Sequence, residues 1–301
     1  MRKACLAFLC YLTIDHCFAQ QDLDSFLKTN DIWPPNTVNI GGGVYMDQTE
    51  IANIHWLEFI HYLAKDSTRD RYISMLPDTT VIWPLSKSDI FIGRDGIDST
   101  HQSDPEKMVE HYFRYPGYRY FPVVGVSYEQ AEMYCKWRSE AVMLTVNDEL
   151  AKNNKKFRVK YTYYLPALEE YRKASDSLME RGTLDVRVTR NINRLFPKED
   201  PGKSYYMANV WQPLPLFKGR RVWLNQFHRF GYIFENPPNS KKIYNIYGNV
   251  SEMTSEKGKS FGGSWIHDSW KISRDAVFYY DRPQHWLGFR CACKVEILEA
   301  R

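Results

Sequence analysis

Regular hydrophobic periodicity is confined to short stretches of this chain, and this scarcity limits the folds available to it. Helical spacing recurs over residues 49–63, 128–141 and 168–174. Residues 66–121 carry only weak periodicity, and Gly and Pro interrupt every apolar run between 182 and 242. We therefore expect a loop-rich fold with a few helices and short strands.

Aromatic residues make up 15% of the chain, with 21 Tyr and 9 Trp, so we expect many half-buried rings with polar tips. The net charge of +4, from 40 basic and 36 acidic residues, is too small and too scattered to favour a nucleic-acid partner. After the first twenty residues no stretch is long and apolar enough to span a bilayer.

The N-terminus predicts a secretory signal peptide over residues 1–19. Arg2 and Lys3 precede an apolar run, and Ala19 ends a segment that a signal peptidase would recognise. The alternative is a buried N-terminal helix. Cys17 follows Asp15 and His16 rather than a small residue, which argues against lipidation. We expect an exported protein in the periplasm or at the outer membrane.

Export leaves three of the six cysteines in the mature chain: Cys135, Cys291 and Cys293. In an oxidising compartment, three thiols suggest one disulfide and one cysteine left over. Either Cys291 or Cys293 could pair with Cys135 across the core.

The remaining chain is expected to form an N-terminal arm over 20–38 and a single domain over 39–301. Thr49 is predicted to cap a helix whose buried face carries Ala52, Trp56, Phe59, Ile60 and Leu63. A short apolar strand at 122–126 precedes a capping box formed by Ser127 and Gln130. That helix should end near Ala141 with Cys135 facing inward, followed by a charged surface insertion at about 143–161.

Segments in the right order over residues 40–295 resemble the formylglycine-generating enzyme (FGE), or sulfatase-modifying factor, family. The segments are QTEIANIHWLEFIHYL (48–63), PVVGVSYEQAEMYCKW (122–137), YYLPALEEYRKAS (163–175), IYNIYGNVSEMTSE (243–256), SFGGSW (260–265) and LGFRCACK (287–294). The resemblance implies an irregular α+β fold related to C-type lectins and stabilised by calcium. It also implies a disulfide between Cys135 and Cys291, with two reduced buried cysteines as the alternative.

The resemblance further implies a calcium loop made by Asn245, Gly248, Val250 and Glu252, whose side-chain and backbone oxygens suit a hard cation. The alternative is that Asn249 and Glu252 merely cap a turn. A second family calcium site would fall on Asn209, Val210, Asn225 and Phe227, where Asn225 stands in place of an Asp.

Active members of the family use two cysteines, four residues apart, shortly after a Gly-Gly-Ser motif, because soft thiolates hold copper(I). In GGSWIHDSWKISR (262–274) the first position is His267, and the second falls near Ile272 or Trp270. We therefore expect no copper and no catalytic residue. The remaining histidines do not cluster as an iron site would require.

The resemblance extends to the FGE-like gliding-motility and type IX secretion lipoproteins of Bacteroidetes. It rests on PDTTV (77–81), YPGY (115–118) and CKWRSE (135–140). It implies a non-catalytic structural or binding component of an envelope assembly, with envelope proteins as partners. The alternatives are an oxygen-dependent sulfatase-maturing or related metal-dependent oxidase, and a carbohydrate-binding module.

Overall fold

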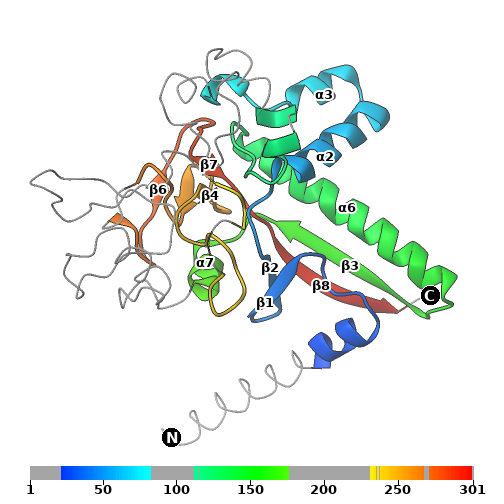
Figure 1. Ribbon diagram of the computed structural model, residues 1–301. Coiled ribbons are helices and arrows are strands. Elements are labelled where there is room, and N and C mark those ends of the chain that lie inside the picture. Colours follow the sequence, from blue (N-terminus) through cyan, green and yellow to red (C-terminus); the bar gives the residue numbers. More distant parts are fainter. Residues whose placement is uncertain are drawn as a thin grey trace, which may run out of the picture.

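The computed structural model describes residues 22–82, 112–114, 116–175, 231–234, 236, 238–267 and 271–299, and it shows a mixed helix and sheet fold with two small sheets (Figure 1). The predicted signal peptide and the second predicted calcium site (Asn209, Val210, Asn225 and Phe227) lie outside these residues. Within them, no helix has the length and apolar character needed to cross a membrane.

The first sheet has the order β1-β2-β8-β3, and every pair in it is antiparallel. Its strands are β1 (Thr37–Gly41), β2 (Val44–Asp47), β3 (Phe157–Tyr164) and β8 (Ala292–Glu299). β3 and β8 pair over their full length, and alternate residues of β3 are buried, as expected for a sheet with one covered face. The last strand of the chain is thus central to the sheet.

Helix α6 (Tyr128–Lys152) runs along β3 and β8 (Figure 1). The predicted capping box at its start is confirmed. The backbone N–H of Gln130 donates to Ser127 Oγ at 3.2 Å, and the backbone N–H of Ser127 donates to Gln130 Oε1 at 2.7 Å. Cys135 is buried and faces inward, as predicted.

The prediction that this helix ends near Ala141 was wrong. α6 continues to Lys152 because its second half also packs on the sheet: Leu150 is buried, and the Asn147 side chain bonds both the N–H and the C=O of Val159. The predicted insertion at 143–161 therefore contains the end of α6 and most of β3. Its Lys and Asp residues are exposed on α6, on β3 and in the turn between them.

Helix α2 (Asn53–Asp66) follows β2 and leads to α3 (Arg69–Ser74). Trp56, Phe59, Ile60 and Leu63 form its buried face as predicted. Thr49 does not cap it; Ala52 occupies the N-cap position instead. The chain stays extended there because residues 51–53 bond to distant backbone, including Ile51 N–H to Phe289 C=O at 2.9 Å. The predicted strand at 122–126 is likewise reduced to a single bridge, Ala52 to Pro122.

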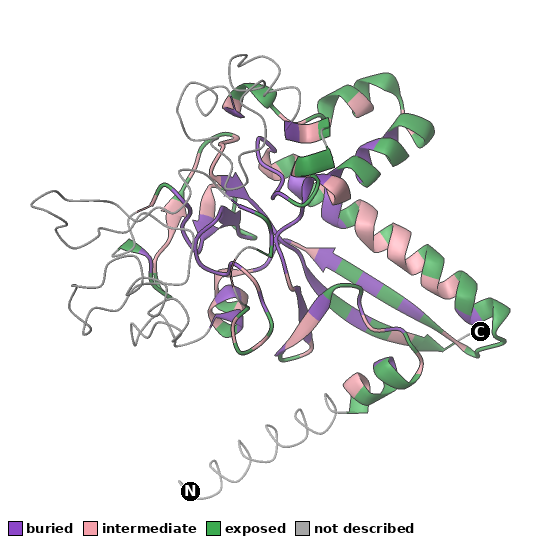
Figure 2. Cartoon of the chain, in the orientation of Figure 1, coloured by how far each residue is buried: buried purple, intermediate pink, exposed green. Residues whose placement is uncertain are grey.

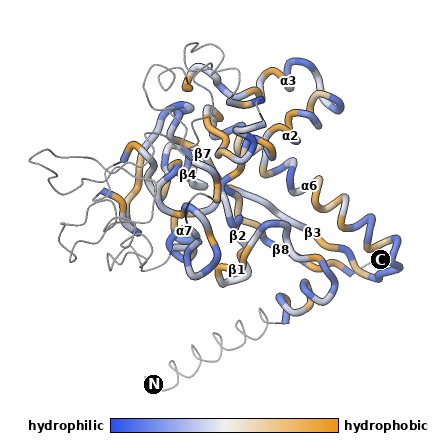
Figure 3. The backbone as a smooth tube through the Cα atoms, viewed as in Figure 1, coloured by the Kyte–Doolittle hydropathy of each residue, from blue (hydrophilic) through white to orange (hydrophobic). Residues whose placement is uncertain are grey.

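The main core lies between α2, α6 and the first sheet, where burial is concentrated (Figure 2). Trp56 stacks on Tyr134 at 5.6 Å between ring centroids, and the edge of Tyr134 meets Phe289 at 5.5 Å. These contacts bring together three segments far apart in the sequence. Hydrophobic and hydrophilic residues alternate along α6, as expected for a helix with one buried face (Figure 3). The expectation of buried and half-buried rings is met.

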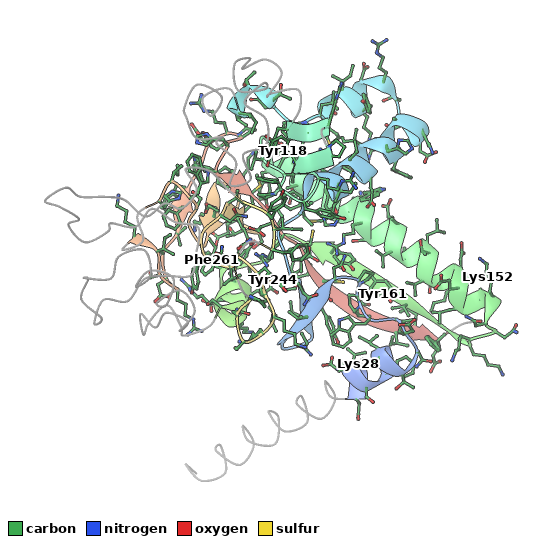
Figure 4. All side chains as sticks on the ribbon, in the orientation of Figure 1. Lys28, Tyr118, Lys152, Tyr161, Tyr244 and Phe261 are labelled. Atoms are coloured by element: carbon green, nitrogen blue, oxygen red, sulfur yellow. The ribbon has the colours of Figure 1, made fainter. Side chains whose placement is uncertain are left out.

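The second sheet has the order β6-β5-β4-β7. Its strands are short: β4 (Ser251–Met253), β5 (Lys259–Phe261), β6 (Phe278–Tyr279) and β7 (Leu287–Gly288). Helix α7 (Leu168–Ala174) packs beside it, with Tyr171 stacked on Phe261 at 5.0 Å. Phe261 and Tyr244 lie on this side of the molecule, whereas Tyr161 lies on the side of the first sheet (Figure 4). Loop residues contribute Ile243, Ile246, Tyr247 and Ile272 to the second core, beside residues from strands and α7.

The predicted N-terminal arm packs against the domain. Residues 22–29 are helical, Leu27 and Ile32 are buried in the main core, and the edge of Trp33 meets Tyr45 at 4.9 Å. The Tyr161 hydroxyl donates to the Ile32 carbonyl at 2.7 Å. The arm therefore covers part of the β1-β2-β8-β3 sheet.

Candidate functional site

The loop after β5 holds the residues that the sequence resemblance aligns with the family's catalytic segment. Its course depends on two glycines with positive φ, Gly262 at 86° and Gly263 at 67°. A Cβ on Gly262 would lie 2.5 Å from the Ile246 carbonyl oxygen, so this backbone approach excludes any other residue. Both glycines and Ser264 are buried. The loop is thus fixed by its own backbone.

His267, the residue at the first catalytic-cysteine position, is held in a closed turn. Its N–H donates to the Ser264 carbonyl at 2.9 Å, and its Nδ1 is 2.7 Å from the Ser264 hydroxyl. Its ring contacts Phe278 and Trp286, with centroids 4.2 and 5.1 Å away. The Ser264 hydroxyl is fully buried, so this Ser–His pair is placed as a structural turn and does not expose a nucleophile.

Ile272, one of the two candidates for the second position, is a core residue. It is 6% exposed and packs in the cluster around Phe261 and Tyr247. A Cβ on Gly263 would meet its Cγ1 and Cδ1 at 2.7 Å, so the two residues are in tight contact. Trp270, the other candidate, lies outside the described residues.

In the predicted calcium loop, Glu252 forms a buried ion pair with Arg290. Arg290 is fully buried and donates from Nε and Nη2 to the two carboxylate oxygens of Glu252, each at 2.5 Å. Its remaining N–H groups donate to the carbonyls of Asp47, Gln48 and Tyr244 at 2.8–3.3 Å. All five guanidinium N–H groups are therefore used, and a single side chain joins three separate segments.

Beside this pair, Glu50 is the second buried carboxylate of the cluster. Asn249 donates to its Oε1 at 2.8 Å, and Asn245 donates to its Oε2 at 3.3 Å. Burial raises the pKa of Glu50 to about 8, against the opposing attraction of Arg290. Sequence reasoning assigned no role to Glu50 or Arg290, although both lie within the quoted family segments. Their burial was the missing information.

The four predicted calcium ligands lie together, but in this arrangement they do not fit a calcium ion. Both oxygens of Glu252 face a guanidinium, which a cation would have to displace. The Asn245 side-chain oxygen accepts from Asn236 at 3.0 Å. Calcium takes six to eight oxygen ligands, so it needs the donors that protein groups already occupy here. Among the described residues, no group of three or more His, Cys, Asp or Glu side chains is arranged to hold a metal.

The structure distinguishes the two possible partners of Cys135. Its sulfur lies 3.2 Å from that of Cys291, whereas Cys293 lies on β8 opposite Tyr45 and Tyr163. The separation exceeds an S–S bond of about 2.05 Å, and all three cysteines are free thiols in the structure. The Cys135–Cys291 disulfide therefore stays a prediction.

Cys135 and Cys293 do not have the character of reactive cysteines. Burial raises the pKa of Cys293 to about 12, and it raises the pKa of Cys135 well above its usual value. A raised pKa keeps the thiol protonated, whereas nucleophiles and metal ligands are thiolates. Chemistry through sulfur would require a more acidic, more accessible cysteine.

With these features in place, the comparisons define the class of protein. Residues 13–295 match the family described as "Sulfatase-modifying factor enzyme 1-like domain". The chain belongs to this FGE-sulfatase family.

One curated relative is distant in sequence. The chain is 25% identical to formylglycine-generating enzyme from Mus musculus over 223 residues, covering 71% of this chain and 49% of the mouse protein. It thus spans about half the length of that curated relative.

Two solved structures show limited likeness. PvdO from Pseudomonas aeruginosa has 18% identity and a TM-score of 0.36, over 58% of this chain and 63% of that one. CarF has 14% identity and a TM-score of 0.35, over 84% and 87% of the two chains. We draw no conclusion from either score.

Proposed function

We propose that this protein is a non-catalytic FGE-like domain that is exported and acts as a structural or binding component of a bacterial envelope assembly. The assembly we favour is of the type IX secretion or gliding type. One observation carries the non-catalytic part: the first thiolate position is a hydrogen-bonded histidine in a closed turn. The candidate Ile272 at the second position is a buried aliphatic residue.

The non-catalytic part rests on the ligands that copper(I) requires. Copper(I) is selected by soft sulfur ligands. The only cysteines beyond the predicted leader are Cys135, Cys291 and Cys293, and all three are buried. None of them lies between residues 262 and 290, where the family places its pair.

The envelope assignment rests on the signal-like N-terminus and on the segments shared with the gliding and secretion lipoproteins. Tagged full-length protein, incubated with envelope membranes of the source bacterium, should recover envelope proteins that include type IX components. Recovery of none of them would remove the assembly from the proposal and leave the non-catalytic part standing.

The non-catalytic part is tested separately. Protein loaded with copper(I) and given a cysteine-containing sulfatase peptide should consume no more oxygen than the metal alone. A His267→Ala variant serves as the control for adventitious copper at that imidazole. Oxygen uptake coupled to conversion of the peptide cysteine, and absent from His267→Ala, would establish an oxidase and overturn the proposal.

A further inference from the structure

A cavity of about 260 Å³ lies where α2, α3 and α6 meet, away from the loop that replaces the catalytic segment. Three elements line it, and they are neighbours in Figure 1. The lining residues are Phe59, Tyr62, Leu63, Asp66, Ser67, Arg71, Met133, Lys136, Trp137 and Glu140. Its volume falls just below the roughly 300–1,000 Å³ of sites that hold drug-sized ligands, so it suits a single small ring.

One wall of the cavity is aromatic. Tyr62 and Trp137 lie with ring centroids 6.0 Å apart and planes inclined at 44°, and Phe59 lies 5.2 Å from Trp137. Tyr62 remains 43% exposed, which is unusual for a large ring so close to a core cluster. The buried indole nitrogen of Trp137 has no hydrogen-bond partner in the described part of the chain. The wall thus offers open ring surface on Tyr62, whereas the indole donor of Trp137 is buried and takes no part in the open surface.

The mouth of the cavity carries two cations and two anions: Arg71, Lys136, Asp66 and Glu140. All four are exposed. Within the described residues, none of them forms an ion pair. The Arg71 Nη2 instead donates to Met133 Sδ at 3.2 Å. The net charge of these four groups is zero. A charged ligand would be attracted by the two groups of opposite sign and repelled by the two of like sign.

We propose that this cavity binds one neutral pyranose ring of a saccharide. A pyranose presents an apolar C–H face, which can lie against Tyr62 and Trp137, and a rim of hydroxyls that both donate and accept. Carboxylates accept from such hydroxyls and cations donate to them, so unpaired charges of both signs suit this ligand. The inference does not depend on the proposed function, since the cavity lies apart from the catalytic-segment loop.

The test uses the full chain and neutral methyl glycosides of glucose, galactose, mannose and N-acetylglucosamine, together with their uncharged oligosaccharides. Saturation-transfer NMR and calorimetry should find at least one with a Kd on the order of 1 mM as a single ring. Tyr62→Ala should weaken its binding at least tenfold, and Glu140→Gln several-fold. Tyr279→Ala removes a tyrosine that is 72% exposed on β6, far from the cavity in sequence, and should leave binding unchanged.

Three results would overturn the assignment. One is the absence of binding to every saccharide by a protein whose thermal unfolding is normal. Another is saccharide binding that Tyr62→Ala and Glu140→Gln leave unchanged, which would place the ligand elsewhere. The third is Tyr62-dependent binding of a zwitterionic amino acid or a peptide in place of the sugars.

Discussion

The two halves of this molecule each contain an arginine–carboxylate pair, partly buried in one half and fully buried in the other, and the pairs differ in how much structure depends on them. In the half built from α6 and the first sheet, Arg138 donates to Asp47 at 2.7 Å and to the Pro35 carbonyl at 3.0 Å, and lies over the ring of Tyr163. In the loop-rich half, Arg290 bonds Glu252 through two N–H groups and three backbone carbonyls through the others.

The difference shows how irregular backbone is stabilised. Strands β3 and β8 satisfy their polar groups through a continuous ladder, so Arg138 adds to an arrangement that is already bonded. The carbonyls of Asp47, Gln48 and Tyr244 have Arg290 as a partner where ladders are short or absent. One side chain thus replaces several backbone contacts, and the loop-rich half should be the more sensitive to its loss.

The largest effect should come from a disulfide inside the half built from α6 and the first sheet, because Cys135 and Cys291 both lie in its core. Oxidation of Cys135 and Cys291 would cross-link residues 156 positions apart, which the loop-entropy model values at about 4–5 kcal/mol. Refolding in an oxidising buffer should give a peptide pair linked through these residues, and reduction should lower the Tm. A Cys293→Ser variant should behave as the wild type. Linkage of Cys135 to Cys293 would contradict the assignment.

The arginine comparison is tested directly by Arg290→Met and Arg138→Met. Arg290→Met leaves the buried Glu252 unpaired and should cost about 3–5 kcal/mol of unfolding free energy, measured by urea denaturation. Arg138→Met should cost about 2 kcal/mol, because Asp47 keeps the Cys291 N–H as a donor at 2.9 Å. Equal losses in the two variants would show that both halves depend on their pair to the same degree.

A smaller, pH-dependent effect is expected on the α2 side. The Ala52 N–H donates to His55 Nδ1 at 3.2 Å, which requires a neutral ring. Burial, and then the charge of Arg138, lower the pKa of His55, with Asp47 acting in the opposite direction. The stability that the neutral His55 cap contributes is therefore fully present above the pKa of histidine in the unfolded chain, about 6.5. It is lost as pH falls through the lower pKa of His55 in the folded protein.

His55→Gln keeps the capping acceptor without its titration. The wild type should lose up to about 1 kcal/mol more stability than this variant between pH 7 and pH 5, the usual contribution of a cap. Parallel stability curves for the two proteins would show that His55 does not titrate with folding.

The smallest expected effect is that of a calcium chelator. Because Arg290 already neutralises Glu252, EDTA should leave the Tm unchanged, and added calcium should not raise it. A calcium ion held at one hundred times its Kd would stabilise the fold by about 2.7 kcal/mol, which a melting curve would resolve. A clear downward shift with EDTA would restore the calcium site predicted from the sequence.

The sequence was sufficient to predict those features that depend only on residues close together in the chain. The capping box at Ser127 and the inward face at Cys135 follow from residues within one or two helical turns. The helix end at Lys152 does not, because it depends on Asn147 bonding the backbone of Val159 in a strand. Thr49 failed as a cap for the same reason: the backbone beside it bonds to residue 289.

For the candidate site, the ordered segments were enough to place the family. They could not show that Glu252 would face Arg290. The two residues are 38 positions apart, and whether a carboxylate meets a cationic side chain or a metal depends on the final packing. The cavity beside α6 was also beyond prediction, since Tyr62 and Trp137 resemble ordinary core aromatics in the sequence.

The contact between Gly263 and Ile272 bears on whether a pair of cysteines could be introduced into this loop. Ile272 fills a tight space against the loop and Phe278, so a smaller thiol there would open a void in the second core. Placing a second thiol at residue 267 would also break the hydrogen bond to Ser264 and the ring contacts of His267. Evolution or engineering would therefore have to rebuild the packing of the loop before two cysteines at these positions could hold a metal.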